Sequence, residues 1–99
     1  MYLDYYIKDI EKVCKKHKVK FLFAFGSVLT KNFNEESDID LVVEIKSTDP
    51  IEYAENYFGL KFMLEDLLKR PVDLLEQKAL KNPYFIKCIN KSKKTIYAA

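Results

Sequence analysis

The 99-residue chain has room for one hydrophobic core, because two cores of half this size would each bury too little surface to offset chain entropy, so we expect a single domain over residues 1–99. Hydrophobic residues make up 48% of the chain and only two Gly and three Pro are present, which excludes disordered and fibrous classes. With a formal charge of +2, no apolar run near the roughly 18 residues of a membrane span and no signal-peptide order at the N-terminus, the chain is expected to be cytoplasmic.

Helical and strand-like segments alternate along the chain. Apolar residues from Leu3 to Cys14 recur at spacings of three and four, which is the period of an amphipathic helix. The segment 19–25 is aromatic and aliphatic, and the segment 38–45 becomes β-branched after a polar start, so both predict buried strands. The expected elements are a helix over 2–17, strands over 19–25 and 38–45, a helix over 50–69, a strand over 71–76 and a short helix over 83–90.

The order of these elements predicts an α/β (α+β) fold with one small mixed sheet and helices packed on it. Asp49 and Pro50 form a typical cap and first turn for the long helix. Gly59 lies inside that helix, where Gly costs about 1 kcal/mol relative to Ala. No internal repeat or linker interrupts the pattern.

The two cysteines and the lysine-rich segment near the C-terminus indicate no chemistry of their own. Cys14 and Cys88 lack metal-ligand spacing, and we expect core thiols rather than a disulfide. The lysine-rich segment 90–94 could neutralise phosphates by counterion release. Since no aromatic residues are interleaved with basic ones in a nucleic-acid pattern, we expect a solvated basic end and no direct binding of nucleic acid.

Two aspartates open the second expected strand. In a strand, Asp38 and Asp40 point to the same face with Cα atoms about 6.6 Å apart. Carboxylates on one face repel and raise each other's pKa unless a cation lies between them, so the pair indicates a metal site. Glu35 and Glu36 precede the strand in a polar loop and are expected to be solvated.

A third aspartate, Asp73, lies between Val72 and Leu74 on the last expected strand, where a charge on an apolar strand is costly unless it is paired or metal-bound. If this strand neighbours the second one, Asp73 completes a triad with Asp38 and Asp40. Three hard oxygen ligands suit Mg²⁺, which takes further ligands from water and substrate phosphates.

Gly26 and Ser27 follow the first expected strand. A strand that ends at Gly, with Ser as the N-cap of a short helical turn, presents backbone N–H groups to an anion. Gly also lets the backbone approach a phosphate closely. The pair therefore predicts a phosphate-binding turn.

Together, Gly26-Ser27, ten intervening residues and the Asp-Ile-Asp of 38–40 read G-S-x10-D-x-D, with Asp73 on a later strand. This pattern resembles the active-site signature of the DNA polymerase β-like nucleotidyltransferases. The length and the segments "FAFGS", "SDIDLVV" and "PVDLLE" resemble a minimal nucleotidyltransferase (MNT) domain, the antitoxin of HEPN/MNT toxin–antitoxin pairs. Many members carry basic residues and a Gly after Gly-Ser, whereas this chain has "VLTKNF", in which only Lys31 is basic.

The resemblance implies a nucleotidyltransferase fold and transfer of AMP from ATP to a tyrosine of a partner HEPN toxin in a hetero-oligomer. It implies that Gly26 and Ser27 bind the nucleotide, that Asp38, Asp40 and Asp73 are catalytic and hold two Mg²⁺ ions, and that Asp73 is the general base. A second function stays open, in which the chain is a non-catalytic antitoxin that neutralises its partner by binding alone.

Overall fold

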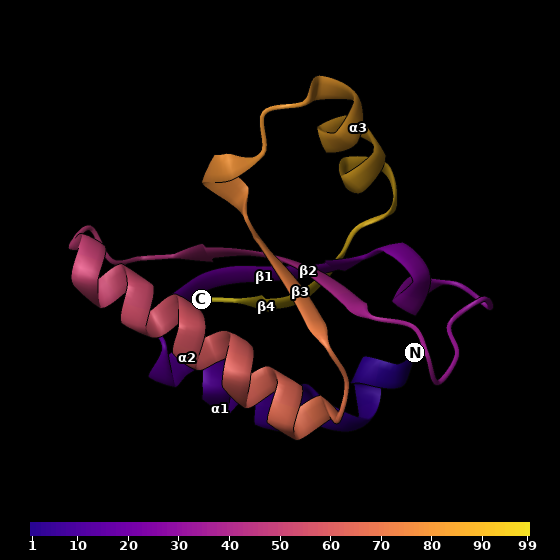
Figure 1. Ribbon diagram of the computed structural model, residues 1–99, viewed down its shortest axis with the longest axis horizontal. Helices are drawn as coiled ribbons and strands as arrows, with labels where there is room; N and C mark the ends of the chain where they lie inside the picture. The colour runs from indigo at the N-terminus through magenta and orange to yellow at the C-terminus, as the bar shows by residue number, and fades with distance from the viewer.

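A four-stranded sheet with the order β3-β2-β1-β4 lies at the centre of the computed structural model, which describes residues 1–99 (Figure 1). β1 runs antiparallel to both β2 and β4, and β2 runs parallel to β3. The predicted mixed sheet is therefore confirmed, and β3 lies beside β2, which is the arrangement that the triad of aspartates requires. The strands are β1 (Val19–Phe25), β2 (Ile39–Ile45), β3 (Val72–Glu76) and β4 (Lys94–Ala98).

Three α-helices are distributed over the two faces of the sheet. α1 and α2 cover one face, and α3 lies on the opposite side with the 3₁₀ turn that follows β3 (Figure 1). None of the helices has the length and apolar character needed to cross a membrane. The helices are α1 (Ile7–Lys16), α2 (Pro50–Leu68) and α3 (Pro83–Ser92), and the 3₁₀ turns are Tyr2–Tyr6, Gly26–Leu29 and Gln77–Ala79.

The main core lies between the sheet and the helices α1 and α2. Alternate strand residues point into it, as expected from the two-residue period of a strand. The opposite residues of the same strands face α3 or solvent, so two polar side chains can occupy that face without disturbing the core. The buried strand residues of the main core are Val19, Leu22, Ala24, Ile39, Leu41, Val43, Ile45, Val72, Leu74 and Ile96, and α2 contributes Leu60, Leu64 and Leu68.

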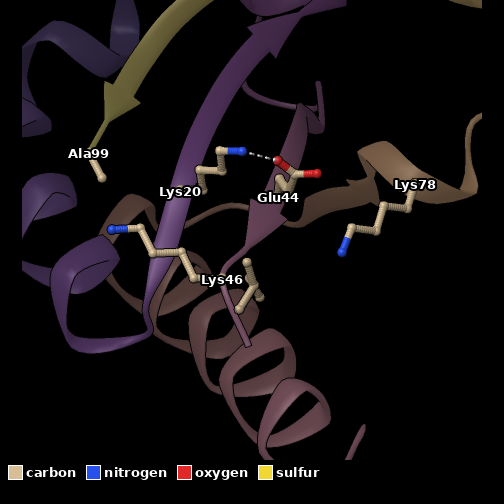
Figure 2. A pocket seen from close by; sticks show the side chains of 6 residues that line it. Lys20, Glu44, Lys46, Lys78 and Ala99 are labelled. Atoms are coloured by element: carbon tan, nitrogen blue, oxygen red, sulfur yellow. Dashed lines mark ion pairs between the residues drawn. The ribbon is translucent and has the colours of Figure 1, made fainter. Parts of the chain in front are cut away.

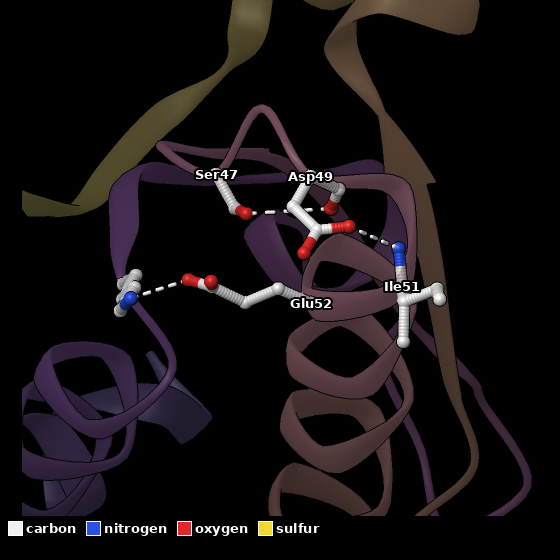
Figure 3. Close-up of polar contacts among 5 residues, drawn as sticks. Ser47, Asp49, Ile51 and Glu52 are labelled. Carbon is white, nitrogen blue, oxygen red and sulfur yellow. Dashed lines mark hydrogen bonds and ion pairs between the residues drawn. The ribbon is translucent and has the colours of Figure 1, made fainter.

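The N-terminus of α2 is capped as the sequence predicts (Figure 3). The Asp49 Oδ1 atom accepts a hydrogen bond from the Ile51 N–H at 3.0 Å, and Pro50 occupies the first turn. Glu52 forms an ion pair with Lys18, which ties the cap to the turn before β1. The helix ends at Leu68, since the next residue adopts a left-handed conformation with φ of 56°.

The first expected helix is divided in two. A 3₁₀ turn over Tyr2–Tyr6 precedes α1, so the regular helix begins at Ile7 rather than at residue 2. The Tyr2 hydroxyl donates to the Leu68 carbonyl at 2.7 Å, and the terminal amine pairs with Asp4 at 2.8 Å. The first contact holds this turn against the end of α2 and the second closes the turn on itself, neither of which a helical period in sequence can indicate.

The C-terminal end of the chain also differs from the expectation. α3 continues to Ser92, and β4 then pairs antiparallel with β1, so the lysine-rich segment leads into an edge strand rather than a solvated end. The Lys93 Nζ atom lies 4.3 Å from the centre of the Phe23 ring. Cys14 is buried as expected, and burial raises its pKa to about 12. Cys88 is exposed, so the prediction of a core position for it is wrong.

Gly59 is explained by the packing of α1 against α2. A Cβ atom at this position would lie 2.8 Å from Nε2 of His17, closer than real contacts allow. The His17 ring is buried and its Nδ1 atom donates to the Val13 carbonyl at 2.8 Å, so the ring has little freedom to move aside. The absence of a side chain at residue 59 thus makes room for the imidazole.

We expect Gly59→Ala to destabilise the protein by up to about 2 kcal/mol, because the cost of overpacking, about 1–3 kcal/mol, is offset by a gain in helix propensity of only about 1 kcal/mol. Urea unfolding measures the change in the free energy of unfolding. In a His17→Ala background the same substitution should stabilise instead, since the obstructing ring is gone. A stabilising effect in the wild-type background would contradict this explanation.

Candidate active site

Asp40 and Asp73 are direct neighbours across two parallel strands. In the register of β2 and β3, Asp40 is paired with Asp73, and adjacent strands lie about 4.8 Å apart. The next residues in both strands, Leu41 and Leu74, point into the main core. Both aspartates therefore share the opposite face of the sheet, where Asp40 is half-buried and Asp73 is exposed.

Asp38 lies just outside the ladder, because β2 begins at Ile39. Its side chain is exposed at the end of the loop that leads into the strand. The pKa of Asp40 is raised above its ordinary value of 3.8, first by burial and then by the negative charges of Asp73 and Asp38. The charges of Asp73 and Asp38 thus act on Asp40 at one end of the sheet.

The aspartate carboxylates at this end of the sheet are chemically suited to bind a divalent cation. Asp40 is half-buried beside two like charges, a situation that a bound cation relieves. Aspartate oxygens are also the ligands that Mg²⁺ prefers. The side chains are not drawn together into a finished site, since no group of three or more His, Cys, Asp or Glu residues is arranged to hold a metal ion.

Gly26 connects the end of β1 to this acidic face. Phe25, the last residue of β1, pairs with Asp40 across the sheet, and Gly26 follows with a φ of +76°. A Cβ atom on Gly26 would lie 2.6 Å from Oδ2 of Asp40. Only Gly tolerates both the backbone conformation and the close approach of the carboxylate. The Gly-Ser segment and the aspartates therefore meet in space, as the sequence pattern predicts.

Ser27 is the second residue of the 3₁₀ turn and not its N-cap. The cap position belongs to Phe25, and no side chain caps the turn. The Ser27 carbonyl accepts hydrogen bonds from the Thr30 N–H and from the Thr30 hydroxyl, both at 2.9 Å. The expected capping role is therefore wrong, because the left-handed Gly26 already starts the turn one residue earlier. Lys31, the basic residue that follows, is exposed.

α3 packs against the turn that follows β1. The ring of Phe85 packs edge-on against Phe25, with ring centres 6.0 Å apart, and α3 contacts the Gly26–Leu29 turn. Asn82 caps α3 by accepting from the N–H groups of Tyr84 and Phe85. Sequence reasoning did not anticipate this contact, since nothing in the helix pattern shows which face of the sheet α3 covers.

A basic hollow of the surface lies away from the aspartates. It encloses about 420 Å³ and is lined by Lys20, Glu44, Ile45, Lys46, Lys78 and Ala99 (Figure 2). Glu44 lies four residues beyond Asp40 on β2, and Lys20 Nζ is 3.5 Å from Glu44 Oε2. The hollow brings together lysines and a single acidic side chain, so it lacks the paired aspartates and the Gly26 turn of the aspartate face.

Solved structures share this arrangement of helices and strands. A structure described as a minimal nucleotidyltransferase superposes with a TM-score of 0.76 at 25% identity, covering 93% of this chain and 90% of that one. A toxin–antitoxin complex with AMP-PNP gives a TM-score of 0.72 at 22% identity, covering 94% and 73%. A complex of a tri-AMPylated Shewanella oneidensis HEPN toxin with its MNT antitoxin gives 0.67 at 20%, covering 100% and 74%. At identities below 25%, the last two matches establish the fold alone.

Relatives found by sequence have higher identity to the chain than these solved structures. "Putative protein adenylyltransferase MJ0128" of Methanocaldococcus jannaschii is 43% identical over 88 residues, covering 84% of this chain and 87% of the relative. A second chain of that organism with the same description, MJ1379, is 35% identical over 91 residues, covering 84% and 90%. The family described as "Polymerase beta, Nucleotidyltransferase" matches residues 8–99. The chain belongs to this nucleotidyltransferase family.

Proposed function

We propose that the protein transfers AMP from ATP to a tyrosine of a HEPN toxin and so acts as its antitoxin. The observation that carries this proposal is the meeting of Asp40 with Asp73 on one side and Gly26 on the other. An acidic pair next to a phosphate-binding turn is the arrangement that phosphoryl-type transfer requires. The names of the relatives, which describe protein adenylyltransferases, support the same reaction.

The residues of the site have separate roles in the proposed reaction. Backbone N–H groups of Gly26 and Ser27 bind phosphate oxygens, since the positive φ of Gly26 leaves the turn open to close approach. Asp38, Asp40 and Asp73 would hold two Mg²⁺ ions at the sheet end. When bound, these ions supply charge stabilisation for the phosphates and a lower pKa for the attacking hydroxyl.

The transfer itself is an in-line displacement at the α-phosphorus of ATP. The tyrosine oxygen forms a bond to this phosphorus, the bond to the oxygen bridging the α- and β-phosphates breaks, and pyrophosphate leaves with that electron pair. Asp73 takes the phenolic proton, a role for which its exposed position at the face of β3 is suited. The products are the O-adenylylated tyrosine and pyrophosphate.

A HEPN toxin is the proposed acceptor because structural neighbours are complexes of this kind. One neighbour is a toxin–antitoxin complex with AMP-PNP, and another contains a tri-AMPylated HEPN toxin. AMP adds bulk and negative charge to a tyrosine, which repels a phosphate backbone from a nearby RNA-cleaving site. Modification would therefore silence the toxin without lasting contact.

A non-catalytic antitoxin is the second candidate, and one observation favours it. The turn after Gly26 and Ser27 continues with Val28 and Leu29, and the first basic side chain, Lys31, is exposed. Fewer cations near the turn mean weaker attraction for a triphosphate. In this reading the fold would be kept for binding alone.

Co-expression with a HEPN toxin separates the two candidates. We expect the toxin to gain the mass of one or more AMP groups, measured by mass spectrometry of the intact chain, with the modified tyrosine identified in peptides. The gain should disappear with Asp38→Ala and persist with Glu36→Ala, a matched change of an exposed carboxylate in the same loop. An unmodified toxin held inactive in a stable complex would instead establish the binding-only function.

A further inference from the structure

Arg70 lies over two neighbouring aromatic rings, close to the loop that leads to Asp38. Its guanidinium carbon is 4.9 Å from the centre of the Tyr2 ring and 4.5 Å from that of Phe33. The two rings are themselves 5.4 Å apart, between centres. A guanidinium that contacts two ring faces in this way is held by cation–π attraction as well as by packing. The side chain is therefore fixed in place by residues from two distant parts of the chain.

The same guanidinium holds the loop that leads to Asp38. Its Nη1 atom donates to the carbonyl of Asn34 and, at 3.2 Å, to the carbonyl of Ser37, which immediately precedes Asp38. The other hydrogen bonds of residues 31–38 are made within the segment 30–37. Arg70 is thus the residue that fastens this loop to the rest of the protein by hydrogen bonds.

Arg70 also stands at the entry of the strand that carries Asp73. It lies three residues before Asp73 and next to Pro71, whose carbonyl accepts the Ile39 N–H at 3.0 Å. One side chain consequently connects the segment before Asp38 with the segment before Asp73. The planar guanidinium can reach two carbonyls and two ring faces at once, which a lysine ammonium cannot do.

We propose that Arg70 is a positioning residue that holds Asp38 beside Asp40 and Asp73. The inference rests on the proposed function, because it assigns Arg70 a part in preparing that site for Mg²⁺. Asp38 lies outside the β2 ladder, so its place depends on the loop rather than on sheet hydrogen bonds. Substitution of a residue that orients a metal ligand without touching the metal typically lowers metal affinity by about 10–100-fold. Loss of the Arg70 contacts should therefore weaken Mg²⁺ binding while the protein stays folded.

The test uses Arg70→Lys and Arg70→Met, with Tyr2→Phe as the matched control. Tyr2→Phe keeps the ring over Arg70 but removes the hydroxyl that donates to Leu68, so it perturbs the same corner without freeing the loop. The first readout is the initial rate of tryptic cleavage after Lys31, followed by fragment mass. The second is the Mg²⁺ concentration that gives half-maximal AMP transfer to the co-purified toxin.

Both Arg70 variants should be cleaved after Lys31 about tenfold faster and need about tenfold more Mg²⁺, with maximal rates at saturating Mg²⁺ within about threefold of wild type. Tyr2→Phe should show neither change. A lower maximal rate with an unchanged Mg²⁺ dependence would overturn the positioning role. Unchanged cleavage in Arg70→Lys would overturn the loop attachment, and this readout stands even if Arg70→Met does not fold.

This inference is separated from the proposed function by readouts that do not depend on AMP transfer. If the wild-type protein transferred no AMP, the proposed function would fail. The tryptic assay and Mg²⁺ binding measured by calorimetry would still decide whether Arg70 positions Asp38. Equal Mg²⁺ affinity in the wild type and Arg70→Lys would then overturn the inference.

Discussion

Asp40→Asn is expected to abolish AMP transfer and, at the same time, to raise the melting temperature of the metal-free protein at neutral pH. The pKa of Asp40 is raised by burial first and then by the charges of Asp73 and Asp38. The folded state therefore disfavours the charged carboxylate. The isosteric amide removes the charge that binds the cation and also the repulsion, so function and stability should move in opposite directions.

The pH dependence follows from the sign of the shift. Because the folded pKa of Asp40 lies above the ordinary value of 3.8, the stability linked to its protonation is fully present below that value and is lost as pH rises through the folded pKa. The stability advantage of Asp40→Asn should accordingly be largest near neutral pH and fade in acid. Thermal melts at several pH values in the presence of a chelator measure this difference.

The expected sizes make the result easy to recognise. Transfer should fall by at least about 100-fold, the usual effect of removing a major source of charge stabilisation. The melting temperature should rise by a few degrees, and Glu36→Gln, which changes an exposed carboxylate, should alter neither property. A less stable Asp40→Asn protein at neutral pH would show that the carboxylate makes favourable contacts that outweigh the repulsion.

The meeting of the candidate site residues could be predicted from the sequence because it depends on strand patterns. The apolar runs around Asp40 and Asp73 define buried strands, and the period of two then places both carboxylates opposite the core. Gly26 could be identified for a similar reason, since a Gly at the end of an apolar strand marks a sharp turn. In the folded protein, the Gly-Ser and Asp-x-Asp segments of the sequence pattern meet where Gly26 approaches Asp40 closely.

Features that depend on long-range contacts could not be read in this way. β4 has one buried residue, Ile96, and begins at Lys94, so its segment shows no alternation and only the short hydrophobic run 96–99. Arg70 reaches carbonyls 36 and 33 positions earlier in the chain, at Asn34 and Ser37. Such contacts follow from the folded topology and not from the residues beside Arg70. Sequence period indicates which face a residue occupies, whereas only the structure shows what that residue touches.

Mg²⁺ together with ATP should stabilise the wild-type protein strongly if the aspartates and the Gly26 turn form one site. A ligand at about 100 times its Kd adds about 2.7 kcal/mol to the free energy of unfolding. For a domain of this size, about 1 kcal/mol corresponds to 4–8 °C, so the melting temperature should rise by about 10 °C or more. Differential scanning fluorimetry across an ATP titration at fixed Mg²⁺ measures the shift.

The dependence of this shift on both ligands tests the site as a unit. The aspartates attract the cation but repel the triphosphate, so ATP without Mg²⁺ should give little stabilisation, and Mg²⁺ alone should give less than the pair. Asp73→Asn should lose most of the shift seen with Mg²⁺ and ATP, because it removes one carboxylate from the face shared with Asp40. A full shift in Asp73→Asn would remove Asp73 from the nucleotide site, and an unchanged melting temperature in the wild type would favour the binding-only antitoxin.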